Sequence, residues 1–333
     1  MTRIRLLGIA VFASAAMALS AGSATALSVH WMRGFAAPNT PAKYNRVGVL
    51  KIGPAHAKNV LVLEPGTSAG SAYFVPLAQW IVSKLPGWQV WSIERRENLI
   101  EDQSELNLAK KGKVTGTQLF NYYLGYLSNP SVTKHFRILS PAAYSFAKGW
   151  GMNVAVQDLH RVIGAARKLG GKVVLGGHSL GGSVVAAYAT WNFGGHAGGR
   201  DLAGLLFDDG SSFRTESAAQ ARAALNDLNA SNASPWLTFG SIPSPYSGLF
   251  VMTGSEGALI DPNSPSTGQE FSLLPAGLKP SVRVTNIAQF GYALNATAHE
   301  NALQQGLAAS PDQPPLTALL ELAVAPPSMP ERK

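Results

Sequence analysis

The stretch from Lys172 to Gly182 constrains the fold of this chain more than any other part of the sequence. It reads KVVLGGHSLGG, a β-branched apolar run followed by a serine between glycines. Gly177 and Gly181 lie two positions before and after Ser179, which is the Gly-x-Ser-x-Gly pattern of a sharp turn between a strand and a helix. Glycine at both positions lets the strand and the helix approach closely. The pattern therefore predicts that Ser179 is an exposed nucleophile.

The segments on either side support this interpretation. Residues 152–169 carry Leu159, Val162 and Ile163 at helical spacing, and residues 180–191 begin with small residues that let a helix lie tightly on a sheet. A helix, a strand, a serine turn and a second helix, in this order, are typical of the α/β-hydrolase fold. We expect that fold: a mostly parallel sheet flanked by helices, with a helical lid inserted after the sixth strand.

The composition excludes several classes of protein. With 46% apolar and 14% charged residues, the chain is expected to fold compactly and not to remain disordered. It contains no cysteine, so neither a disulfide nor a thiolate site can form. The formal net charge is +8, but the basic residues are scattered, and their one local cluster, at 110–113, is interpreted as a solvated loop. We therefore expect no nucleic-acid partner.

The N-terminal 26 residues have the pattern of a secretory signal peptide. Arg3 and Arg5 precede an apolar stretch at 6–19, and Ala24-Thr25-Ala26 resembles a cleavage site. The apolar stretch is shorter than the roughly 20 residues of a membrane-spanning helix, which disfavours the alternative of a retained anchor. We expect a secreted or periplasmic protein that meets a membrane only if the leader is not removed, and whose mature chain has a net charge of +6.

The remaining chain divides into three regions. Residues 27–212 are expected to form the hydrolase core, residues 213–307 a lid or cap, and residues 308–333 an irregular tail rich in proline. Within the core, residues 28–43 are interpreted as irregular. Strands are expected at 44–52, 59–63, 88–93, in the run that enters the serine turn, and at 202–207.

The second of these strands leads into a loop that is a candidate oxyanion site. Residues 64–71 read EPGTSAGS, and a loop of small residues at this place supplies one backbone donor in such enzymes. We expect the Thr67 N–H to be that donor and the Leu180 N–H to be the second. The alternative is a plain strand-to-helix turn. The charged run 94–98, at the end of the next strand, either lines the pocket mouth or forms a surface ion-pair cluster.

The triad acid and base must follow Ser179, in that order. Asp209 ends the strand at 202–207 and is one candidate acid. Of seven histidines only His196 and His299 follow the serine, and His196 precedes the strand that would carry the acid. His299 is therefore the candidate general base, and the alternative is that it is a surface residue of a lid helix.

A second arrangement around His299 is also possible from the order of the residues. Residues 249–253 could form a seventh strand and 281–285 an eighth, with Glu256 or Asp261 as the acid between them. The two arrangements differ in the acid and share the base.

Several short runs resemble a group of secreted bacterial α/β-hydrolases. They are Pro65-Gly66-Thr67, Glu94 to Asn98, Trp150-Gly151, Asp158-Leu159, Val174 to Gly182, Ala187 to Phe193, Gly204 to Gly210, Leu273 to Ala276 and Thr285-Asn286. The resemblance covers most of the mature chain. It implies that Ser179 is the nucleophile, that Asp209 closes the sixth strand, and that the reaction is of the hydrolase or lipase class.

Related chains of this group continue beyond the region of Ala296 with further strands and a late histidine, whereas this sequence stops at Lys333. From this departure we expect residues 308–333 not to complete the fold and the activity to be weak or absent.

Three functions are compatible with these residues. The first is a serine esterase or lipase that acts on a small ester, because an apolar lid suits acyl chains. The lid residues expected to contribute are Phe250, Phe271, Leu273, Leu274 and Phe290. The second is a binding protein on a hydrolase scaffold without a proton relay, and the third is an acyltransferase. No metal or dinucleotide motif stands where a site would need it, so we expect no metal and no cofactor. The sequence makes no prediction of the oligomeric state.

Overall fold

The computed structural model describes residues 27–210, 217–230, 233–239, 242–274 and 276–292. The leader at 1–26, His299 and the tail at 308–333 lie outside these residues. Within them, no helix has both the length and the hydropathy needed to cross a membrane.

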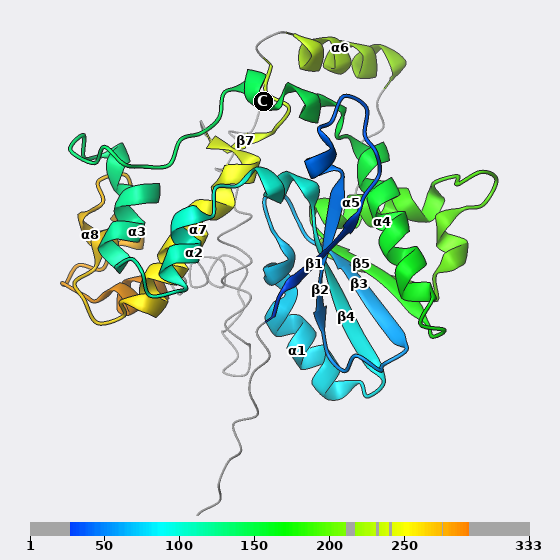
Figure 1. The fold of residues 1–333 in the computed structure, drawn as a ribbon, viewed down its shortest axis with the longest axis horizontal. Coiled ribbons are helices and arrows are strands. Elements are labelled where there is room, and N and C mark those ends of the chain that lie inside the picture. The colour runs from blue at the N-terminus through cyan, green and yellow to red at the C-terminus, as the bar shows by residue number, and fades with distance from the viewer. Residues whose placement is uncertain (1–26, 211–216, 231–232, 240–241, 275, 293–333) are drawn as a thin grey trace, which may run out of the picture.

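A mixed sheet of six strands forms the centre of one lobe in the described part of the chain (Figure 1). In sheet order the strands are β1 (Val29–Arg33), β2 (Arg46–Ile52), β4 (Trp88–Glu94), β3 (Asn59–Glu64), β5 (Val173–His178) and β6 (Gly204–Asp208). The four from β4 to β6 run parallel, whereas β1 and β2 are antiparallel to their neighbours. The expected mostly parallel sheet is thus a mixed one.

Strand β1 corrects the prediction that residues 28–43 are irregular. It pairs antiparallel with β2, with Trp31 opposite Gly48. A Cβ on Gly48 would lie 2.5 Å from the Val29 side chain and 2.7 Å from Glu94 Cβ, so glycine makes room for the side chains of both neighbouring strands. Such a pairing depends on a partner 17 positions away, which leaves no local pattern in the sequence.

Helices cover both faces of the sheet. The helices of this lobe are α1 (Val75–Lys84), α4 (Met152–Arg167) and α5 (Leu180–Thr190), with 3-10 turns at Ala42–Tyr44, Ser71–Phe74 and Gly198–Asp201. Val60 and Val62 of β3 pack with α4 and α5, whereas Leu61 and Leu63 pack on the opposite face with α1. Because side chains alternate along a strand, β3 is buried on both faces.

A second lobe consists of helices from two separate segments (Figure 1). The first segment contains the 3-10 turn η3 (Arg96–Ile100), α2 (Ser104–Ala109), α3 (Gly116–Tyr123) and 3-10 turns at Gly125–Leu127 and Pro141–Gly149. The second contains α7 (Ser244–Ile260), α8 (Thr267–Glu270) and a 3-10 turn at Ala276–Leu278. The segments meet where α7 contacts α2 and α3, and an aromatic cluster of Tyr123, Phe136, Tyr144 and Tyr246 is buried between them. A lid was expected from residues 213–307 alone, whereas the helical lobe also includes elements from residues 96–149.

Helix α7 overturns the prediction of a strand at 249–253. Ser244 and Pro245 begin the helix, and proline in the first turn is favourable because its missing N–H has no acceptor there. A short apolar run does not by itself distinguish a strand from a buried helix. The predicted strand at 281–285 is also absent: Thr285 makes only an isolated bridge with Pro265.

Two further elements follow β6. Helix α6 (Ala218–Asn229) begins with a capping box between Ser217 and Gln220 and buries none of its side chains. A short hairpin of β7 (Thr238–Phe239) and β8 (Ile242–Pro243) then leads into α7.

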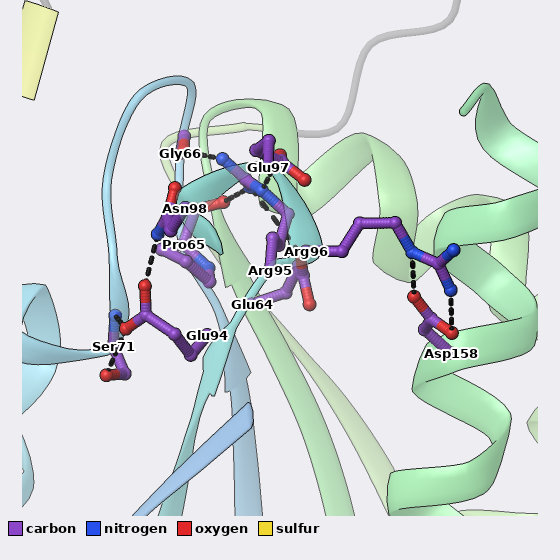
Figure 2. Close-up of polar contacts among 10 residues, drawn as sticks. All are labelled: Glu64, Pro65, Gly66, Ser71, Glu94, Arg95, Arg96, Glu97, Asn98 and Asp158. Atoms are coloured by element: carbon purple, nitrogen blue, oxygen red, sulfur yellow. Dashed lines mark hydrogen bonds and ion pairs between the residues drawn. The ribbon is translucent and has the colours of Figure 1, made fainter. Parts of the chain in front are cut away.

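A buried ion pair joins the end of β4 to α4. Arg96 donates from Nε to Asp158 Oδ2 at 2.8 Å and from Nη2 to Asp158 Oδ1 at 2.6 Å. Its Nη2 also donates to the Phe35 carbonyl at 2.9 Å, and the Phe35 N–H donates to Asp158 at 2.6 Å. Figure 2 shows both bonds between the two side chains. With Arg96 only 2% exposed, the pair fixes η3 against α4.

Asp158→Ala is expected to lower the free energy of unfolding by about 3–5 kcal/mol, because it leaves the buried Arg96 guanidinium without its carboxylate. Urea denaturation followed by circular dichroism measures this. The control is Arg167→Ala, which removes a half-exposed guanidinium 2.6 Å from Asp201 while His196 stays 2.9 Å from the same carboxylate. The control should cost less than about 1 kcal/mol. Equal losses in the two variants would contradict the prediction.

Candidate active site

Ser179 occupies a strained turn between β5 and α5. Its φ and ψ are 51° and −119°, in a region that residues other than glycine rarely adopt. In the described chain, three of the four non-glycine residues with positive φ belong to this region: Ser68, Ser179 and Asp209. Strain of this kind persists only where the surrounding structure imposes it, and it concentrates at functional sites. The elbow predicted from the glycine pattern is therefore present.

The glycines of the elbow permit backbone segments to approach so closely that no side chain would fit between them. A Cβ on Gly181 would lie 2.0 Å from the Glu64 carbonyl oxygen, and one on Gly177 would lie 2.4 Å from the Gly181 backbone. Gly182 is similarly close to Gly210, at 2.6 Å. The first turn of α5 is thus packed directly against the ends of β3, β5 and β6.

The candidate oxyanion loop, residues 64–71, lies against the elbow. A Cβ on Gly66 would be 3.2 Å from Ser179 Cβ and 3.0 Å from His178 Nδ1. In the part of the chain that the structure describes, the Thr67 N–H has no hydrogen-bond acceptor. Leu180 is the first residue of α5, and an N–H in this position has no intrahelical acceptor. The two segments that carry the expected donors thus meet at the elbow, and no acceptor for the Thr67 N–H is found among the described residues.

Arg95 holds this loop from the opposite side. Its guanidinium donates to the Pro65 carbonyl and to the Gly66 carbonyl, both at 2.6 Å, and from Nε to Glu97 at 2.5 Å (Figure 2). Glu64 is 3.5 Å from the same guanidinium. Arg95, Arg96 and Asn98 are buried and Glu94 and Glu97 are half-buried, so the run 94–98 is not a surface ion-pair cluster. Arg95, Arg96 and Glu97 line a cavity, as the other alternative predicted, whereas the role of the run as an anchor of the loop was not predicted.

Burial raises the pKa of Glu64 to about 7, although the positive charge of Arg95 acts in the opposite direction. The negative charge of Glu97 also raises the pKa of Glu64, by less than burial does. The carboxyl group lies beneath the loop with only 3% of the residue exposed. Near neutral pH it exchanges a proton where other carboxyl groups remain ionised.

His178, the neighbour of the serine, does not face the solvent. Its Nδ1 shares a hydrogen bond with the Tyr73 hydroxyl at 2.9 Å, and the two rings stack with centroids 5.3 Å apart. Burial lowers the pKa of His178, while the charges of Asp208 and Asp209 act to raise it. The contact with Tyr73 holds the His178 side chain in place beside the serine turn. No pattern in the sequence indicated this contact.

The candidate acids lie in different places. Asp209 follows β6 and is exposed, and the next residue, Gly210, packs on the Ser179 backbone. Asp261 ends α7, where its Oδ1 accepts a bond from Ser264 at 2.6 Å and its Cβ lies against Gly116 of α3. The structure thus brings Asp209 to the elbow and places Asp261 in the helical lobe. Glu256 is on α7, and His299 lies outside the described residues.

A cavity of about 170 Å³ lies at the carboxyl ends of the strands and reaches the elbow through Leu180, whereas Ser179 and Thr67 are not among its lining residues. Leu180 and Val184 of α5 form one wall, and Trp150 and Met152 contribute further apolar surface. Carboxyl ends of parallel strands are where open sheets place ligands. Of the lid residues expected here, those with described side chains, Phe271, Leu273, Leu274 and Phe290, do not line it. Leu273 is 60% exposed, and Phe271 packs edge-on against Phe120 of α3.

Comparisons with known proteins give distant structural likenesses only. No family model matches the sequence, and no curated protein matches it. A thioesterase domain from the curacin biosynthetic pathway matches with a TM-score of 0.36 and 13% identity, over 63% of this chain and 56% of that domain. A monoglyceride lipase variant from Saccharomyces cerevisiae matches with a TM-score of 0.30 and 13% identity, over 56% of this chain and 45% of that one.

A monoacylglycerol lipase from Paleococcus ferrophilus matches with a TM-score of 0.32 and 13% identity, over 76% of this chain and 72% of that one. The first two matches cover about half of the other protein. The structural neighbours are thus lipases and esterases.

Gly181→Ala is expected to destabilise the protein by at least about 3 kcal/mol, because its methyl group would overlap the Glu64 carbonyl and force strand and helix apart. Gly164→Ala is the matched control in α4, where an added Cβ meets nothing within 4 Å. It should stabilise the protein by up to about 1 kcal/mol, from the better helix propensity of alanine. Chemical denaturation of both variants tests this, and a Gly181→Ala protein as stable as wild type would refute it.

Glu64→Gln is expected to change how stability depends on pH. In wild type the folded protein keeps a proton between the ordinary carboxyl pKa and about 7, so the contribution of Glu64 is complete at low pH and lost as pH rises through 7. Glutamine does not ionise, so the variant does not lose stability at this position as pH rises. Its stability relative to wild type should therefore rise by up to about 3 kcal/mol from pH 4.5 to 8.

Denaturation midpoints across this pH range measure the effect. Asp102→Asn is a control of opposite sign: burial raises the pKa of Asp102, but hydrogen bonds from Tyr122 and Ser104 outweigh it and lower the pKa. The contribution of Asp102 is therefore lost as pH falls. A difference between Glu64→Gln and wild type that stays constant with pH would contradict the prediction.

Proposed function

We propose that this protein is a serine hydrolase of the α/β-hydrolase type that cleaves small carboxylic esters through an acyl-enzyme on Ser179. The observation that carries the proposal is the strained Ser179, which lies where the loop of Thr67 meets the start of α5 at Leu180, two positions whose N–H groups have no acceptor among the described residues. A nucleophile beside preorganised donors is the arrangement that acyl transfer requires.

The reaction proceeds in two halves. The Ser179 hydroxyl oxygen attacks the ester carbonyl carbon while His299 takes its proton, and the carbonyl oxygen becomes an oxyanion bound by the two N–H groups. Collapse of this intermediate breaks the bond to the alcohol, which leaves with the proton from the histidine. Water then attacks the acyl-enzyme in the same way and releases the acid. Asp209 orients the histidine in this proposal, since it is the candidate acid beside the elbow.

The cavity favours short, uncharged acyl groups. A volume of about 170 Å³ is smaller than the roughly 300 Å³ at which pockets for larger ligands begin. The charges on its wall are already paired, because Arg95 bonds Glu97 and the loop carbonyls. Nothing there attracts a charged acyl group. The leader at 1–26 supports export, so the proposed substrate is an ester met outside the cytoplasm.

Ser179→Ala is expected to reduce hydrolysis of p-nitrophenyl acetate or butyrate at least about 10³-fold. Ser183→Ala, one turn later on α5, is the matched control and should retain activity. A fluorophosphonate should label wild type at Ser179, as peptide mass spectrometry would detect. Rates should fall for acyl chains longer than the cavity accommodates.

Each alternative gives a different result. Retained esterase activity in Ser179→Ala would refute the proposal, as would comparable rates on peptides. A folded protein that neither turns over esters nor reacts with the phosphonate would be a binding protein. Transfer of the acyl group to an added alcohol in preference to water would make it an acyltransferase. Activity that survives in His299→Ala would exclude that residue as the base.

A further inference from the structure

We propose that Arg95 is the positioning residue of the oxyanion site, and that Glu94 assists it at the far end of the same loop. The inference rests on the proposed function, since it concerns how the Thr67 N–H comes to face the oxyanion. It assigns a role to two residues that make no contact with the reacting atoms.

The direction of the Thr67 N–H follows from the geometry of the peptide bond. In a trans peptide the carbonyl of one residue and the N–H of the next point in opposite directions within one plane. The Gly66 carbonyl accepts from Arg95 Nη2 at 2.6 Å, so the Thr67 N–H is turned away from the guanidinium. The Pro65 carbonyl accepts from Nη1 at 2.6 Å, which fixes the preceding peptide plane as well.

The loop has little else to hold this orientation. Its internal backbone bonds are from the Ala69 N–H to the Gly66 carbonyl, at 3.3 Å, and from the Tyr73 N–H to the Gly70 carbonyl, at 3.1 Å. Gly66 allows the backbone both orientations, because it has no Cβ to restrict it. If the peptide between Gly66 and Thr67 turned over, a carbonyl oxygen would replace the N–H and repel the oxyanion. The bond from Arg95 opposes that rotation.

The guanidinium is itself held in place. Arg95 is 8% exposed, and its Nε donates to Glu97 at 2.5 Å while Nη1 also lies 3.5 Å from Glu64. A planar group with donors in fixed directions can bind two carbonyls at once, which the single ammonium of lysine does not reproduce. Arg95 therefore transmits a fixed orientation to both peptide planes.

Glu94 holds the other end of the loop. It accepts from the Ser71 N–H at 2.7 Å, from the Ser71 hydroxyl and from the Asn98 side chain (Figure 2). Glu94 ends β4, and Arg95 follows it. Two consecutive residues at the end of a central strand thus anchor the two ends of the loop, so the sheet determines the loop's position.

The test compares esters with thionoesters in Arg95→Lys. Sulfur is a weaker hydrogen-bond acceptor than oxygen, so a working oxyanion site favours the oxygen ester over its C=S analogue. We expect Arg95→Lys to lower kcat for the oxygen ester about 10²-fold, the effect of losing one oxyanion donor, with less than about a 3-fold change in KM. The ratio of oxygen-ester to thionoester rates should fall with it.

Arg96→Lys is the matched control, an adjacent arginine equally buried but bonded to Asp158 and not to the loop. Whatever it does to stability, the rate ratio should stay at the wild-type value. If Arg95→Lys does not fold, Glu94→Gln serves instead. This variant keeps the shape and one acceptor oxygen, and we expect a smaller fall of the ratio in the same direction.

The outcomes separate this inference from the function on which it rests. If wild type shows no Ser179-dependent ester hydrolysis, the proposed function fails and the inference fails with it. If wild type is active and folded Arg95→Lys keeps the wild-type rate ratio, the function stands and Arg95 is only a structural residue. The same ratio in Glu94→Gln as in wild type would remove Glu94 from the proposal. An equal fall of the ratio in Arg96→Lys would also overturn it, since the effect would then not be specific to the loop.

Discussion

The close approach of the first turn of α5 to the end of β3 is the constraint on which the site depends. Gly181 leaves no space for even a methyl group against the Glu64 carbonyl. Interiors are packed densely enough that such a contact cannot be relieved locally. The turn before the helix must therefore adopt the positive φ of Ser179, and the hydroxyl is presented at the edge of the sheet as a result.

The same approach creates an electrostatic problem beneath the loop. Glu64 ends β3 where the elbow covers it, and a buried carboxyl group favours its neutral form. Arg95 lies nearby, but its shortest hydrogen bonds are to two loop carbonyls and to Glu97, not to Glu64. Burial raises the pKa of Glu64 to about 7, so near neutral pH this carboxyl group is ionised less than an exposed one. The neighbouring charges are paired, Arg95 with Glu97 and Arg96 with Asp158.

The two lobes have different kinds of core. The sheet lobe is filled by aliphatic side chains that alternate between the two faces of β3 and its neighbours. The core of the helical lobe is half aromatic, with tyrosine and phenylalanine from α3, the chain that follows it and α7, and half aliphatic, with residues from η3, α2 and α3. The chain leaves the sheet after β4 to begin this lobe and returns at α4, so the helices next to the site belong to two distant parts of the sequence.

The sequence by itself determined the elements whose causes are local. The run from Lys172 to Gly182 specified strand, turn and helix, because the apolar pattern and the glycines act within a few residues of Ser179. The apolar run of β3 and the charged run at 94–98 were also visible. Thr67 could be named as a donor, but only from its place after a strand.

Only the tertiary structure decided the features that join distant residues. Strand β1 depends on pairing with β2, α7 on packing against α2 and α3, and the role of Arg95 on carbonyls 29 and 30 positions away. The choice between a pocket lining and a surface ion-pair cluster for residues 94–98 depended on burial, which a local charge pattern does not report. These interactions have no local signature, because their free energy comes from contacts that exist only once the sheet has formed.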